Sequence, residues 1–188
     1  MRSGQLRVRE PVRTLALVLV ATTLSACAPD PEPEAEPRAA EPVVGALPSR
    51  TEFVDNGLLF VPEDRASLQV RLGPPDSVSQ KVIANRHVPG VRDTIFIYHY
   101  PQMTVGFHHP GGGRDLLSSV EVRSNDHLRY PLLGLTRDAI DGAFGAPDEA
   151  SDSSLTYYCT SCIAGDDPVE IVFVNGEARR VRFSYYVD

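Results

Sequence analysis

Two stretches of the chain alternate apolar and polar residues, and each follows a short amphipathic segment. The amphipathic segments run from Pro62 to Leu72 and from Thr136 to Phe144, each with apolar residues four apart, a glycine at its end and a proline just beyond. This pattern predicts two short helices. Alternating runs rich in β-branched and aromatic residues predict strands at Thr94 to Tyr100, Met103 to His108, Leu117 to Arg123, Leu155 to Cys159, Val169 to Val174 and Glu177 to Tyr185. Asn175-Gly176, between the last two runs, predicts a tight hairpin.

The two stretches are related by an internal repeat. Laying residues 72–76 over residues 144–148 also pairs Leu68 with Ile140 and Arg65 with Arg137. One unit of this size has a marginal core, so two units are expected to pack together or to share a sheet. We therefore predict an α+β domain over residues 50–188. It consists of two tandem helix-then-three-strand units, about 56–125 and 132–188, that form an antiparallel sheet with the helices on one face.

The first 26 residues have the layout of a secretory signal. Four arginines precede an apolar run from Leu15 to Leu24 and a few small residues. The run is about ten residues long, whereas a membrane-spanning helix needs roughly 20, which disfavours an uncleaved transmembrane anchor. The sequence Leu24-Ser25-Ala26-Cys27 resembles a bacterial lipobox. That resemblance implies cleavage before Cys27, acylation of this cysteine, palmitate included, and a lipid anchor. Ala28 in place of aspartate favours the outer membrane, with the domain facing the periplasm.

Residues 27–49 are predicted to be a tether between the lipidated cysteine and the domain. Proline and glutamate dominate this segment and almost nothing in it could be buried, so an extended spacer is expected; a docking peptide built on its Pro-x-Pro repeats is the alternative. The whole chain has a formal net charge of −7, and removing the arginine-rich signal makes it more acidic. This charge argues against a nucleic-acid partner, which needs a basic surface.

The second unit carries a resemblance to a known family. The residues concerned are Gly134-Leu135-Thr136, Ile140, Phe144-Gly145-Ala146-Pro147, Tyr157-Tyr158 and Phe173-Val174-Asn175-Gly176. They resemble the BamE/SmpA/OmlA and β-lactamase-inhibitor-protein-like fold. The first unit departs from the pattern, because it lacks the Gly-x-Thr start and has a long loop at 79–93. Members of this family act as outer-membrane lipoprotein accessory factors or as proteinaceous enzyme inhibitors, so the resemblance implies binding without catalysis.

The Cys159-Thr160-Ser161-Cys162 motif allows three interpretations. In an oxidising envelope the simplest is a small disulfide between Cys159 and Cys162. A zinc site would need two further ligands, for which the candidates are His87, His99, His108 and His109. A redox pair would need the motif at a helix N-terminus, and a strand is predicted there instead. We predict the disulfide, with no metal and no cofactor.

Histidines and tyrosines are the remaining candidate site residues. His108-His109 and Asp126-His127 could serve as acid-base or metal groups, but solvated loop histidines explain them as well. Tyr98, Tyr100, Tyr157 and Tyr185 form the candidate binding surface, since alternation places aromatic rings on one strand face without showing which face is exposed.

Two functional hypotheses follow. The first is a membrane-anchored lipoprotein that acts as a non-enzymatic protein-binding module, assembly-factor-like or inhibitor-like, with an envelope protein as partner. The alternative is an envelope enzyme or metal-binding protein that uses His108, His109 and the Cys159/Cys162 pair.

Overall fold

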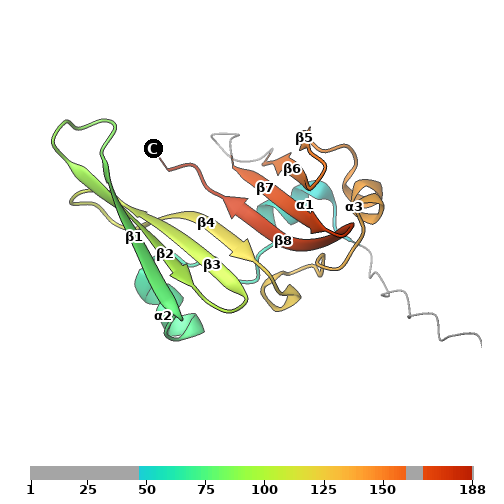
Figure 1. Ribbon diagram of the computed structural model, residues 1–188, viewed down its shortest axis with the longest axis horizontal. Coiled ribbons are helices and arrows are strands. Elements are labelled where there is room, and N and C mark those ends of the chain that lie inside the picture. Colours follow the sequence, from blue (N-terminus) through green and yellow to red (C-terminus); the bar gives the residue numbers. More distant parts are fainter. Residues whose placement is uncertain (1–46, 160–166, 188) are drawn as a thin grey trace, which may run out of the picture. The chain divides into compact units, whose positions relative to one another are not determined.

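The chain folds around one antiparallel sheet with short helices (Figure 1). The computed structural model describes residues 47–159 and 167–187, all of which belong to a unit that spans Val43–Asp188. Cys27 and Cys162 lie outside the described residues. The described part has eight strands in the order β1-β2-β3-β4-β8-β7-β6-β5. Its elements are α1 (Arg50–Asn56), α2 (Arg65–Leu72), β1 (Ser77–Ala84), β2 (Arg92–His99), β3 (Met103–His109), β4 (Leu116–Val122), the 3-10 helix η1 (Asn125–His127), α3 (Arg137–Phe144), β5 (Glu149–Ala150), β6 (Ser154–Tyr158), β7 (Pro168–Val174) and β8 (Glu177–Ser184).

Helices α2 and α3 are bounded by capping residues. The Thr136 side chain accepts a hydrogen bond from the Ala139 amide, which confirms the predicted start of α3. Helix α2 begins later than predicted, because Asp64 caps it and forms a reciprocal capping box with Ser67. Both helices end at a glycine with positive φ, 79° at Gly73 and 76° at Gly145, as the sequence predicts.

The turn between β7 and β8 also follows from the sequence. Asn175 and Gly176 have φ values of 55° and 81°, the left-handed conformation that two-residue hairpin turns require at both central positions. The predicted hairpin is therefore confirmed.

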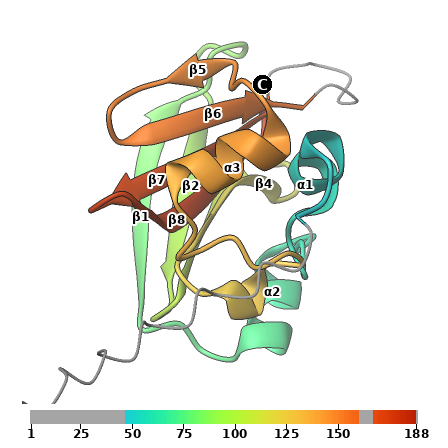
Figure 2. The ribbon, with the colours of Figure 1, turned by 90° about the vertical axis from the view of Figure 1, so that its right-hand side faces the viewer.

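The apolar core lies on one face of the sheet. Phe53 of α1 stacks on Phe144 of α3, with ring centroids 5.2 Å apart, and lies 5.9 Å from the ring of Phe183 on β8. Leu68 of α2 is fully buried, and the guanidinium of Arg65 lies 4.1 Å above the ring of Phe96 on β2. These contacts place the three helices on the same side of the sheet (Figure 2).

The predicted fold class, two helix-then-three-strand units, is wrong. The described chain is mostly an eight-stranded antiparallel sheet with three short α-helices. The predicted loop at 79–93 contains most of β1, a strand whose residues are almost all exposed and which therefore shows no strong apolar alternation. Strand β5 has two residues and gives no periodic signal. Each half therefore contributes four strands, and β4 and β8 meet at the centre.

Candidate functional site

The side of the sheet opposite the helices, here called the open face, has a charged group at its centre. Glu121 on β4 lies opposite Arg182 on β8, and the two side chains are joined by a 2.8 Å hydrogen bond from Arg182 Nη2. Arg123 Nη1 donates to the other carboxylate oxygen of Glu121 at 2.7 Å. Arg180 Nη1 lies 3.9 Å from Glu121, and Arg182 Nη1 lies 3.5 Å from Glu170 on β7. We call these five residues the Glu121 network.

The Glu121 network is held in a fixed arrangement. The Glu121 side chain is only 15% exposed. Burial alone would raise the pKa of Glu121, but the hydrogen bonds from Arg182 and Arg123 outweigh that effect and leave the pKa below its ordinary value. Arg123 also donates to Thr104 Oγ1 and to the carbonyl of Tyr100. Glu121 is therefore an ionised anchor that orients the surrounding guanidinium groups.

The Glu121 network has one more positive than negative charge. Three arginines surround two glutamates, and Arg180 is the arginine least engaged with them, since its nearest carboxylate among the described residues lies 3.9 Å away. Its side chain is 43% exposed. Arg180 is therefore the guanidinium best placed to donate hydrogen bonds to a carboxylate from outside the chain.

Three of the four predicted surface tyrosines do not form an exposed binding surface. Tyr98, Tyr100 and Tyr157 are at most 8% exposed, and all three belong to the core. That part of the prediction is wrong, because residue alternation separates the two faces of a strand without showing which one the helices cover. Tyr185 is partly buried; burial raises its pKa to about 12, and the nearby Asp167 adds to the shift.

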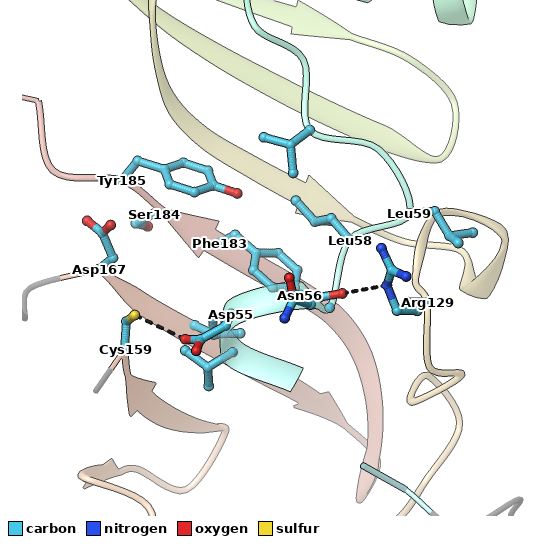
Figure 3. Close-up of a pocket in the computed structure, with 14 residues that line it drawn as sticks. Asp55, Asn56, Leu58, Leu59, Arg129, Cys159, Asp167, Phe183, Ser184 and Tyr185 are labelled. Atoms are coloured by element: carbon cyan, nitrogen blue, oxygen red, sulfur yellow. Dashed lines mark hydrogen bonds between the residues drawn. The ribbon is translucent and has the colours of Figure 1, made fainter. Parts of the chain in front are cut away.

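Tyr185 and Cys159 both line a pocket of about 220 Å³ between the end of α1 and strand β8 (Figure 3). Arg129 Nε donates to the carbonyl of Asn56 at 3.0 Å on its wall. Cys159 is disulfide-bonded, and its sulfur lies 3.1 Å from Oδ1 of Asp55. We interpret this as a close contact rather than a hydrogen bond, because a disulfide sulfur carries no proton. In this state Cys159 is not the thiolate that a zinc site would require.

The two neighbouring histidines of β3 serve different parts of the fold. His108 Nε2 lies 3.0 Å from Asp93 Oδ2, whereas His109 Nδ1 lies 2.8 Å from Asp115 Oδ1. Asp93 is buried, and hydrogen bonds from Asn85, the Gly111 amide and His108 lower its pKa. Asp93 thus holds in place the loop after β1, through Asn85, and the loop after β3, through the Gly111 amide. This role was not predicted from the sequence.

Among the described residues of the enzyme or metal hypothesis, the structure does not bring His108 and His109 near Cys159. Strand β3, with His108 and His109, is four positions from β6 in the sheet, and Cys159 follows β6. At about 4.8 Å per strand this separates them by about 19 Å. Within residues 47–159 and 167–187, no group of three or more histidine, cysteine, aspartate or glutamate residues could hold a metal ion.

The Glu121 network was not predicted from the sequence. Its glutamates and arginines occupy ordinary polar positions of predicted strands, and only the pairing of β4 with β8 brings Glu121 next to Arg182. The alternation of Arg180 and Arg182 around Val181 was a usable signal for two arginines on one strand face.

Comparison with known proteins gives no family assignment. No protein family, curated protein or solved structure matches this chain. No helix in the described part of the chain combines the length and the apolar composition needed to cross a membrane.

Proposed function

We propose that the protein is a membrane-anchored lipoprotein that acts as a non-enzymatic protein-binding module in the cell envelope. The open face of the sheet is its binding surface, and the Glu121 network is the centre of that surface. The observation that carries the proposal is the network itself: three guanidinium groups are oriented around an ionised, largely buried glutamate on a face that the described helices leave uncovered.

The chemistry of the network suits a protein partner with acidic groups. Arginine is enriched at protein interfaces and at their energetic centres. Pairing within the network limits the side-chain entropy that binding would cost. The Arg180 side chain is 43% exposed and lies 3.9 Å from Glu121, farther than the other two arginines, so it can donate hydrogen bonds to a partner carboxylate. The partner is therefore expected to present an acidic segment to this face.

The N-terminal sequence supports a position in the envelope. Its charged, apolar and small-residue regions lead directly to Leu24-Ser25-Ala26-Cys27. Acylation of Cys27 would hold the domain on a membrane, and Ala28 favours the outer membrane as its location. Replacing Cys27 by serine should release the protein from washed membranes into the soluble fraction. Full retention of this variant in the membrane would contradict the lipid anchor.

The binding surface is tested with a matched pair of charge reversals. The full-length protein is cross-linked in its native membrane, affinity-purified, and its partner identified by mass spectrometry. Arg180→Glu should reduce recovery of that partner by about tenfold or more, because the substitution places a carboxylate beside Glu121 and towards an acidic partner. Arg92→Glu makes the same charge change at an exposed residue on the helix-bearing face and should leave recovery unchanged. Equal recovery with both variants, or no protein partner at all, would refute the proposed surface.

A further inference from the structure

The two edges of the sheet differ. Strand β5 ends one edge with two residues, so it offers almost no backbone for pairing. Strand β1 ends the other edge with eight residues, and nearly all of them are exposed. An exposed edge is usually protected by proline, by several charges or by a covering element. Strand β1 contains one charged residue, Lys81, and no proline, and within the described chain it pairs only with β2.

The register of β1 against β2 shows which backbone groups face outward. The Asn85 amide donates to the carbonyl of Val91 at 3.0 Å, in line with the pairing of Ala84 with Arg92. Because hydrogen bonding alternates along an antiparallel strand, the odd-numbered residues of β1 bond to β2. The N–H and C=O groups of the even-numbered residues Val78, Gln80 and Val82 then point away from the sheet.

Val78 and Val82 also have exposed side chains. They lie opposite Tyr98 and Thr94 on the helix-bearing face, yet 48% and 52% of their surface remains accessible. Strand β1 thus combines outward-facing backbone groups with two apolar side chains, four residues apart, on the same face.

We propose that β1 pairs antiparallel with β1 of a second copy of this chain, with Gln80 opposite Gln80 of the second copy. In this register Val78 lies opposite Val82 of the second copy, and the reverse pair forms by symmetry. Both valine pairs are brought together on the helix-bearing side, and Gln80, Val78 and Val82 exchange backbone hydrogen bonds across the interface. The pairing joins the two sheets across a twofold axis.

Charge selects this register over its neighbour. With Gln80 at the axis, Lys81 lies opposite Ser79 of the second copy, and the two lysines are only diagonal neighbours. With Lys81 at the axis, the two ammonium groups would lie directly opposite each other, which is unfavourable. With Ser79 at the axis, Val78 would lie opposite Gln80 and the valine pairs would be lost. Of these three registers, only the one centred at Gln80 combines both Val78–Val82 pairs with separated lysines.

The inferred dimer is independent of the proposed binding surface. Strand β1 is separated from β4, which carries Glu121, by two strands of the sheet. Variants in β1 therefore leave the Glu121 network intact. Failure of one proposal does not imply failure of the other.

Engineered cysteines test the register directly. In a hydrogen-bonded antiparallel pair the Cα atoms are about 5.5 Å apart, within the range that a disulfide spans. The full-length Gln80→Cys protein in envelope membranes should form a covalent dimer under mild oxidation, seen on a non-reducing gel and confirmed by mass spectrometry of the linked peptides. Ser79→Cys and Lys81→Cys should each give no more covalent dimer than the unsubstituted chain. The double variant Ser79→Cys/Lys81→Cys should cross-link, because position 79 lies opposite position 81 of the second copy. A monomeric Gln80→Cys protein, or equal cross-linking by Lys81→Cys, would overturn the proposal.

A second variant tests the valine pairs without introducing cysteine. Val82→Lys places an ammonium group opposite Val78 of the second copy and should raise the dimer dissociation constant about tenfold or more in sedimentation equilibrium. The control is Val70→Lys on α2, at a valine that is 89% exposed and outside the interface. An unchanged dissociation constant in Val82→Lys, or no dimer in the unsubstituted protein, would contradict the proposed pairing.

Discussion

Replacing Phe53 by alanine should destabilise the whole domain. Phe53 is the central side chain of α1 and is completely buried. Its ring contacts Phe144 of α3 and Phe183 of β8, both of which belong to the C-terminal half. Truncation to alanine removes both aromatic contacts and leaves a cavity where α1 meets the sheet.

The expected loss of stability is a large part of the total. Replacing a buried phenylalanine by alanine lowers the unfolding free energy by about 3–5 kcal/mol in total. Part of that loss comes from the two aromatic contacts, which contribute about 0.5–1.5 kcal/mol each. A domain of this size typically has an unfolding free energy of about 5–15 kcal/mol. Urea unfolding followed by circular dichroism should therefore show a lower midpoint with an unchanged slope.

The control for this experiment is Val70→Ala, at an exposed position of α2, which should change the unfolding free energy by less than about 0.5 kcal/mol. A loss below about 1 kcal/mol for Phe53→Ala would contradict the large contribution of Phe53 to core packing. An altered slope would instead indicate a change in the compactness of the denatured or native state, or a transition that is no longer two-state.

Two further predictions concern the open face and the hairpin. Because the folded-state pKa of Glu121 is lowered, its contribution to stability is present above the ordinary pKa of 4.5 and is lost as the pH falls through the lower folded-state value. Glu121→Gln should therefore flatten the pH dependence of the unfolding free energy below about pH 4.5, and an unchanged acid limb would contradict the ion pairs. Gly176→Val should lower the unfolding free energy measured in urea by about 1–2 kcal/mol. A β-branched residue would have to adopt a φ of 81° there, and since no atom obstructs its Cβ, the loss comes from backbone strain alone. Asn175→Gly should be nearly neutral, and equal losses in the two variants would argue against this explanation.

Features fixed by local chemistry could be predicted from the sequence. The threonine cap of α3, the glycines that end α2 and α3, and the Asn175-Gly176 turn all depend on residues within a few positions of one another. Their backbone requirements leave few alternatives, because positive φ angles favour glycine and asparagine. The same locality explains why the similar ends of α2 and α3 were visible as a repeat.

Features that depend on burial could not be predicted. Strand β1 buries almost nothing, so its sequence has no apolar face to reveal it. Tyr98, Tyr100 and Tyr157 follow a strand alternation that is the same for exposed and for buried residues. Only the position of the helices shows that these tyrosines face the core. The strand count and the burial of these tyrosines were both missed for this reason.

The Glu121 network depends on the assembly of both halves of the sheet. Glu121 and Arg123 come from the N-terminal half, whereas Glu170, Arg180 and Arg182 come from the C-terminal half. Neither half alone contains the ion pairs between Glu121 and Arg182, which lie opposite each other where β4 meets β8. Phe53 reinforces the C-terminal side of this junction from the opposite face by contacting Phe183 of β8. A loss of core packing there should therefore weaken partner binding as well as stability, even though Phe53 never touches the open face. Partner recovery with Phe53→Ala, measured where most of the protein remains folded, should accordingly fall more than the folded fraction does.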